Sequence, residues 1–134
     1  MGNQDFREIL SKYRTIAVVG LSPDPGKPSH GVAAYLQGAG FRIIPVNPAC
    51  REILGEQCYP TLADIPGEVE IVDVFRRSEF LPEIVEQAIA KGAKVVWMQE
   101  GIVNEAAAAR AEGAGLSVVM DRCILKEHRR LASR

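Results

Sequence analysis

The fold is most clearly indicated by residues 15–31, which read TIAVVGLSPDPGKPSHG. The run begins apolar and β-branched, breaks at Gly20, crosses a proline-rich loop and becomes helical from about Ser29. A strand, a loop and a helix in this order form the first half of a βαβ unit, and the N-terminus of such a helix attracts anions. We therefore expect this loop to bind a phosphorylated ligand, with Lys27 supplying a positive charge and Ser22 supplying a neutral donor.

Length and composition favour a single globular domain, residues 1–134, with 47% hydrophobic and 25% charged residues. Lys and Arg (16) nearly balance Asp and Glu (17), which argues against nucleic acid and membrane partners. No apolar stretch approaches the roughly 20 residues that span a bilayer. Without a signal-peptide pattern at the N-terminus, a cytoplasmic location is expected. Cys50, Cys58 and Cys123 include no C-x-x-C pair, so neither a disulfide framework nor a zinc site is expected.

Apolar periodicity predicts strands that alternate with helices along the chain. The strands are expected at 15–19, 41–46, 71–75, 94–98 and 116–120, and the helices at 5–13, 29–37, 78–91, 105–112 and from the Cys123 region to Leu131. Residues 49–70 are the least patterned, with one helical turn expected at 61–65. This alternation predicts an α/β fold with a doubly wound, parallel, five-stranded sheet in the strand order 3-2-1-4-5.

Ligands of such sheets bind at the carboxyl ends of the strands. Each predicted strand is followed by a polar or glycine-containing cluster: Gly20-Leu21-Ser22, Asn47-Pro48, Arg76-Arg77-Ser78, Gln99-Glu100-Gly101 and Asp121-Arg122-Cys123. We expect the clusters to converge on one edge, although polar loops also occur without a ligand. The G-x-G-x-x-G fingerprint is absent, and the second strand ends in Asn47 rather than an acid, which disfavours a nicotinamide cofactor.

These motifs, in this order and over nearly the whole chain, resemble the small stand-alone CoA-binding domain proteins, which are similar to the CoA-binding domain of the succinyl-CoA synthetase alpha subunit. The motifs are the loop 18–29, Pro45-Val46-Asn47-Pro48, Asp73-Val74-Phe75-Arg76, Gln99-Glu100-Gly101-Ile102 and Asp121-Arg122-Cys123. The resemblance implies a Rossmann-like fold and coenzyme A as the ligand. Relatives often have Arg in place of Lys27.

The resemblance also implies a binding residue set that follows the course of the ligand. The phosphates would be surrounded by Gly20, Leu21, Ser22, Lys27 and Ser29. The adenosine would be flanked by Val46, Asn47 and Pro48, and the opposite wall would be formed by Val74, Phe75 and Arg76. The pantetheine arm would be followed to its thiol by Gln99, Gly101 and Cys123. Lys27 and the serines could instead belong to a solvated loop. Arg77 and His128 are expected to be solvated, and Cys123 is either buried or able to form a mixed disulfide with CoA.

No pair of catalytic groups can be assembled from the sequence, so the leading interpretation is a CoA or acyl-CoA binding protein, as a carrier, sensor or regulatory module. The alternatives are an NAD(P)-binding oxidoreductase, a partner subunit of an acyl-CoA ligase, and an interaction module without a ligand. Neither His30 nor His128 has the loop context of the phosphorylated histidine of the synthetases, which lies in a second domain. The protein partner is unknown, and the 106–109 helix face could form a homo-oligomer or pack internally.

Overall fold

The computed structural model describes residues 6–132, and the predicted helix start at Asp5 lies outside them. The helices are α1 (Phe6–Lys12), α2 (Pro28–Gly38), α3 (Leu81–Lys91), α4 (Glu105–Gly113) and α5 (Ile124–Ala132), with 3-10 turns η1 (Leu62–Asp64) and η2 (Ser78–Phe80). The strands are β1 (Thr15–Val19), β2 (Arg42–Val46), β3 (Glu52–Ile53), β4 (Glu56–Gln57), β5 (Ile71–Val74), β6 (Val95–Met98) and β7 (Ser117–Val119). The short β3–β4 hairpin lies in the segment that had no clear pattern.

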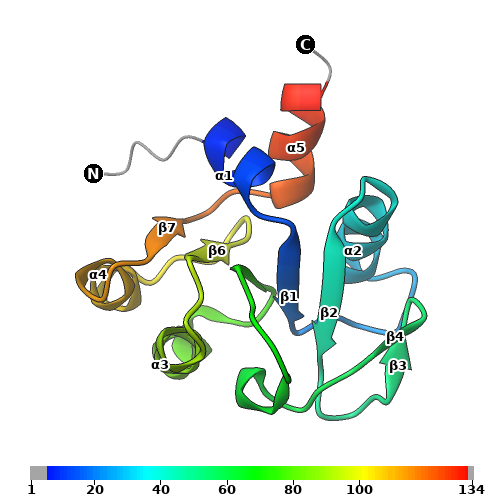
Figure 1. Cartoon of the computed structure of the whole chain (residues 1–134), viewed down its shortest axis with the longest axis horizontal. Helices are drawn as coiled ribbons and strands as arrows, with labels where there is room; N and C mark the ends of the chain where they lie inside the picture. Colours follow the sequence, from blue (N-terminus) through cyan, green and yellow to red (C-terminus); the bar gives the residue numbers. More distant parts are fainter. Residues whose placement is uncertain (1–5, 133–134) are drawn as a thin grey trace.

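Five strands form one parallel sheet in the order β2-β1-β5-β6-β7 (Figure 1). The predicted α/β class, with a parallel five-stranded sheet, is confirmed. The predicted order 3-2-1-4-5 is corrected, because the third parallel strand, β5, pairs with β1 and not with β2. The observed order, numbered along the parallel strands, is 2-1-3-4-5.

The outer edge of β2 explains why β5 does not pair there. Tyr59 donates its N–H to the Pro45 carbonyl and accepts from the N–H of Asn47, both at 3.0 Å, so the loop after β2 occupies that edge itself. All four residues of β5 are buried, as expected of a strand covered on both faces. The structure therefore places β5 in the centre of the sheet.

Helices cover both faces of the sheet, and successive side chains of each strand alternate between them. Ala17 and Val72 face the layer of α3 and α4, whereas Val18 and Trp97 face the layer of α1, α2 and α5. Figure 1 shows α1 beside α5 and α3 beside α4, on opposite sides of β6 and β7. Among the described residues, no helix is long and apolar enough to cross a bilayer.

Two side-chain expectations are resolved by the packing. Ala107 and Ala108 of α4 are buried in the same core cluster as α3, so part of the alanine-rich face packs internally. The expected solvation of His128 is wrong: its Nδ1 lies 2.7 Å from the Tyr35 hydroxyl, and its ring meets Phe41 edge-on. This contact joins α5 to α2.

Candidate functional site

Gly20 directly follows β1 and has a backbone conformation that favours glycine, with φ of +88°. A Cβ at this position would lie 3.0 Å from both the Arg76 Cδ and the Phe75 carbonyl oxygen. The close approach at Gly20 is therefore made by the chain leaving β5. It brings the first and third predicted clusters into contact.

The loop between β1 and α2 is held in shape by its own polar groups. The N–H of Ser22 donates to Ser29 Oγ (3.0 Å), the N–H of Asp24 donates to Ser22 Oγ (3.0 Å), and the N–H of Gly26 donates to Asp24 Oδ1 (2.9 Å). Ser29 is buried, so its hydroxyl shapes the loop from inside. Among the ligand-binding residues predicted in this loop, Lys27 is the one whose side chain is exposed.

Lys27 occupies the N-cap position of α2 and makes no capping hydrogen bond with its side chain. An ammonium group has no acceptor for the N–H groups of the first turn, and its charge repels the positive end of the helix dipole. The charge of Lys27 and the dipole of α2 therefore act together to attract an anion.

The predicted polar group after β2, Asn47, connects two loops. Its Nδ2 donates to the Leu21 carbonyl (2.9 Å), and its Oδ1 accepts from the N–H of Ala49 (2.8 Å). Leu21 itself is fully buried. Asn47 and Leu21 therefore position the surrounding backbone.

A hollow of about 210 Å³ lies at the carboxyl ends of β1 and β2. Val46 and Pro48, expected to flank the adenosine, and Arg76, expected on the opposite wall, line it together. Phe80 and Thr61 also line it and were missed in the sequence. The Arg76 Cζ lies 4.2 Å from the centroid of the Phe80 ring, so a guanidinium and an aromatic ring form one wall.

A second hollow, of about 390 Å³, lies at the ends of β5 and β6, and Arg76 borders both hollows. Phe75 and Gly101 line it as predicted, together with Arg77 and Ile102. The N–H of Gly101 donates to Asp121 Oδ1 at 2.7 Å, so the ends of β6 and β7 are tied together at this edge. The strand-end clusters thus converge as expected.

Of the predicted binding residues, Gly20, Leu21, Ser22, Lys27, Ser29 and Asn47 line neither hollow, and neither do Val74, Gln99 and Cys123, which lie below this edge. Val74 is fully buried, Cys123 is 9% exposed, and Gln99 is 5% exposed. The Gln99 Oε1 accepts from the N–H of Ile124 at 3.1 Å, so this side chain supports the start of α5. Any contact of Gln99 or Cys123 with a ligand at the edge needs a local rearrangement.

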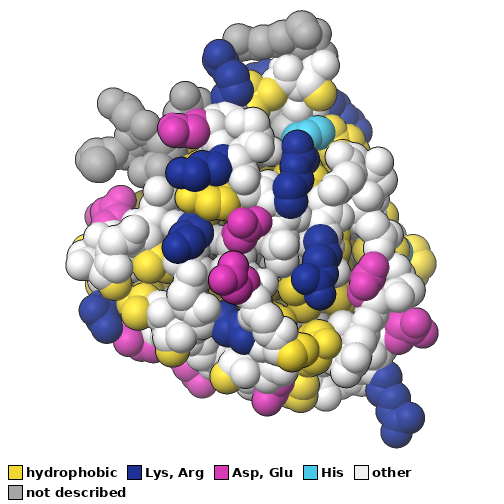
Figure 2. Space-filling model, in the orientation of Figure 1, with side chains coloured by type: hydrophobic (Ala, Val, Ile, Leu, Met, Phe, Trp, Pro, Cys, Tyr) yellow, Lys and Arg dark blue, Asp and Glu magenta, His cyan; other side chains and the backbone are white. Residues whose placement is uncertain are grey.

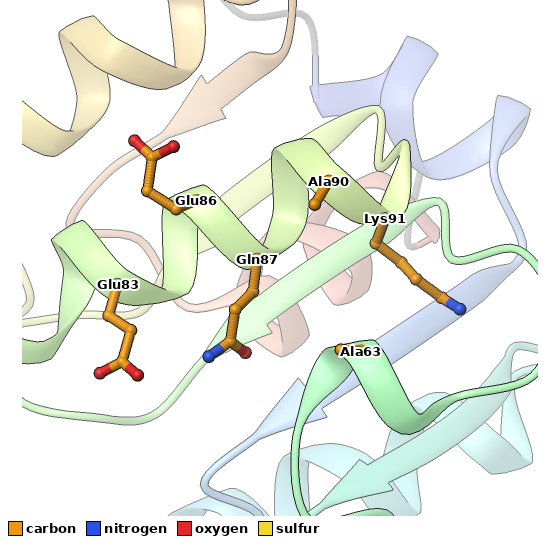
Figure 3. A pocket seen from close by; sticks show the side chains of 6 residues that line it. All are labelled: Ala63, Glu83, Glu86, Gln87, Ala90 and Lys91. Carbon is orange, nitrogen blue, oxygen red and sulfur yellow. The ribbon is translucent and has the colours of Figure 1, made fainter.

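A third hollow, of about 530 Å³, lies between α3 and η1 (Figure 3). Glu83 and Gln87 line both this hollow and the one beside Arg76. Figure 3 shows these two side chains and Lys91 on the side of α3 that faces Ala63, whereas Glu86 points away. Glu86 pairs with Arg110 (2.7 Å), which lowers the pKa of the Glu86 carboxyl. The carboxylate of Glu83 makes the part of both hollows that lies along α3 less suited to phosphate.

The most unusual electrostatic feature is Asp73 in the middle of β5. Its side chain is fully buried, and neither oxygen has a hydrogen-bond partner. Burial raises the pKa of the Asp73 carboxyl well above its usual range. On the face shown in Figure 2, dark blue and magenta side chains are interspersed, and the net charge of the chain is −1. Attraction of a phosphorylated ligand therefore depends on local groups.

The residues missed at the site have different signals in the sequence. Phe80 lies in the first helical turn after β5 and the two arginines that follow it. From this position an aromatic ring can reach the strand ends. Thr61 has no comparable signal, because it lies in the segment without a pattern. Its place in the wall follows from the return of that segment along β2.

The parallel sheet, with helices on both faces and hollows at the carboxyl ends of its strands, defines an α/β domain of Rossmann-like fold. Residues 14–129 match the family model described as CoA binding domain, and the chain belongs to this family.

The relatives include stand-alone proteins and much longer ligases. The chain is 45% identical over 124 residues to the uncharacterized protein YneT of Bacillus subtilis, covering 92% of each chain. It is 36% identical over 92 residues to the ADP-forming acetate–CoA ligase II of Archaeoglobus fulgidus, covering 67% of this chain but 14% of the ligase. A hypothetical protein from Pyrococcus horikoshii has a solved structure that superposes with a TM-score of 0.93 at 48% identity, covering 96% of this chain and 90% of that one.

Proposed function

We propose that this protein binds coenzyme A or an acyl-CoA as a carrier, sensor or regulatory module. The observation that carries the proposal is the exposed Lys27 at the N-cap of α2, in the loop whose first residue, Gly20, lies against the Arg76 side chain that borders both hollows. The membership of the CoA-binding family supports the choice of ligand.

The exposed groups at the edge fit the parts of coenzyme A. Lys27 and the N-terminus of α2 would hold the pyrophosphate, since both attract anions. The hollow between Pro48 and Phe80 would hold the adenosine, with Arg76 stacking or pairing beside it. The pantetheine arm would then run toward Gly101. Bound CoA would supply a thiol for carrying an acyl group.

The proposal assigns no reaction to the protein. Within residues 6–132, no hydrogen bond joins a serine or cysteine side chain to a histidine, which is the usual pairing that activates such nucleophiles. His128 is occupied by Tyr35 on the layer of α2 and α5.

Thermal unfolding in the presence of CoA, acetyl-CoA, NAD, NADP and ATP tests the proposal. A ligand at one hundred times its dissociation constant stabilises the folded state by about 2.7 kcal/mol, so binding is readily seen. We expect CoA or acetyl-CoA to give the largest shift. A larger shift with NAD or NADP would favour an oxidoreductase, and no shift with any of the five would favour an interaction module.

Replacing Lys27 tests the location of the phosphates. Lys27→Ala is expected to weaken CoA binding by about 1.5–3 kcal/mol, the scale of a hydrogen bond to a charged group, as measured by calorimetry. Lys94→Ala is the matched control, because Lys94 is exposed just before β6, at the opposite end of the sheet. Equal affinities of the two variants would place the phosphates away from Lys27.

The similarity to an ADP-forming acetate–CoA ligase favours a second candidate, a partner subunit of an acyl-CoA ligase. Such a subunit would supply the CoA site while another chain supplies the catalytic groups. The test is whether this protein restores activity to a ligase from which the CoA-binding domain has been deleted. Restored activity would favour the ligase role over the carrier role.

A further inference from the structure

Two arginine side chains lie against one aromatic ring at the end of β5. The Arg76 Cζ is 4.2 Å and the Arg77 Cζ is 5.8 Å from the centroid of the Phe80 ring. Both guanidinium groups therefore lie against the same ring.

Neither guanidinium makes an ion pair within the part of the chain that the structure describes, residues 6–132. Arg110, by contrast, pairs with Glu86 at 2.7 Å. Glu79 lines the same hollow as the two arginines, and Glu83 lines the smaller hollow with Arg76, but neither carboxylate forms an ion pair with them. Two like charges without a counter-charge repel each other, and a bound anion would relieve that repulsion.

The space for such an anion is the hollow of about 390 Å³ that Arg76 and Arg77 line with Gly101. The Arg76 side chain also lies against Gly20, the first residue of the loop that leads to Lys27. A ligand whose pyrophosphate is held at Lys27 could therefore reach this hollow with another part.

We propose that Arg76 and Arg77 form a second oxyanion subsite, which binds a phosphate monoester or carboxylate of the ligand, separate from its pyrophosphate. The proposal rests on the proposed function. Guanidinium groups suit these oxyanions because they pair with two oxygens at once. In a CoA thioester, the group is either the 3′-phosphate of the ribose or a carboxylate at the end of the acyl chain.

The test measures affinity by calorimetry for four ligands: CoA, dephospho-CoA, acetyl-CoA and succinyl-CoA. The variants are Arg77→Gln, Arg77→Lys and the control Arg42→Gln. Arg77 is exposed and its side chain makes no capping bond, so the substitution leaves the fold intact. Arg42 is an exposed arginine at the start of β2, at the opposite end of the sheet, and controls for the change in net charge.

We expect Arg77→Gln to weaken binding of the ligand that carries the recognised oxyanion about tenfold or more relative to Arg42→Gln. This is the scale of a lost hydrogen bond to a charged group. Arg77→Lys should recover part of the loss, because it keeps the charge. A loss for CoA and both thioesters that is absent with dephospho-CoA assigns the 3′-phosphate. A loss for succinyl-CoA alone assigns the acyl carboxylate.

An equal loss for all four ligands would place Arg77 on the shared pyrophosphate and overturn the proposal. Affinities equal to those of Arg42→Gln would also overturn it, while leaving CoA binding itself intact. If the unmodified protein binds none of the four ligands, the proposed function fails as well, so the two failures are distinguishable.

Discussion

At the residue scale, two positions in the sheet show how far burial and close packing constrain side-chain choice. Gly20 must lack a side chain because the Phe75 carbonyl and the Arg76 side chain lie where a Cβ would stand. Asp73 keeps a carboxyl group in a layer otherwise made of apolar side chains, such as Val18 and Trp97 on either side. Both positions lie close to the candidate site.

We expect Gly20→Ala to destabilise the protein by about 1–3 kcal/mol, the cost of holding a non-glycine residue in a strained conformation. Urea unfolding measures the change. Gly31→Ala is the matched control, because Gly31 lies in α2 and no atom stands within 4 Å of the place its Cβ would take, so alanine should be neutral or stabilise by up to about 1 kcal/mol. Equal stability of the two variants would show that the backbone at Gly20 relaxes freely.

Asp73 should make the protein less stable as the pH rises. Burial raises the pKa of the Asp73 carboxyl in the folded state above its ordinary value of 3.8. The folded state therefore binds more protons than the unfolded state between pH 3.8 and that raised pKa. Stability therefore falls with rising pH across that window. Asp73→Asn should remove this slope and stabilise the protein at neutral pH, as measured by urea unfolding at a series of pH values. Glu68→Gln, at an exposed position, should keep the slope.

At the scale of the elements, side-chain amides connect the helix ends to the strand-end loops. The Asn104 Oδ1 caps α4 by accepting from the N–H of Ala107 (2.9 Å), and its Nδ2 donates to the Ser78 carbonyl (2.9 Å). Gln99 supports the start of α5 in a similar way. These bonds hold α4 and α5 relative to the edge where a ligand would bind.

Substitutions of Asn104 separate its two roles. Asn104→Ala should cost about 1–2 kcal/mol from the lost cap, and more from the unpaired Ser78 carbonyl. Asn104→Ser keeps a capping oxygen and loses the bond to Ser78, so it should cost less than alanine does. Chemical unfolding measures both. If serine and alanine were equally destabilising, the cap would contribute nothing.

At the scale of the whole molecule, the contact between α2 and α5 connects the helix that follows the 20–27 loop to the C-terminal helix. His128 and Tyr35 form this contact, and the edge of the His128 ring also meets Phe41. Burial, with a smaller effect from Arg14, lowers the pKa of His128 below its ordinary value of 6.5. The helix layer therefore contains a group whose protonation opposes folding.

This contact predicts a loss of stability as the pH falls below 6.5. In that range the unfolded state binds a proton at His128 that the folded state does not, down to the lowered folded-state pKa. His128→Gln should flatten this slope in pH-dependent thermal unfolding, whereas His30→Gln, a substitution at the start of α2, should preserve it. An unchanged slope in His128→Gln would assign the titration to another group.

The strands and most helices were predictable from local pattern, because a five-residue apolar run or a 3.6-residue periodicity reports burial directly. The places of Pro48 and Gly101 beside hollows at one edge of the sheet were likewise predictable, since residues that follow parallel strands meet at one edge. The roles of Asn47 and Gln99 were not predictable, because a polar side chain after a strand looks the same whether it contacts ligand or backbone.

The position of β5 and the pairing of Arg77 with Phe80 came from the folded structure alone. The return of the loop to the edge of β2 excluded β5 from that edge, and it depends on hydrogen bonds between residues with no shared local pattern, such as Pro45 and Tyr59. The ring of Phe80 gathers the arginines because of how α3 begins against the strand ends. Local pattern encodes which residues are buried, whereas edge pairing and side-chain stacking depend on which distant segments meet.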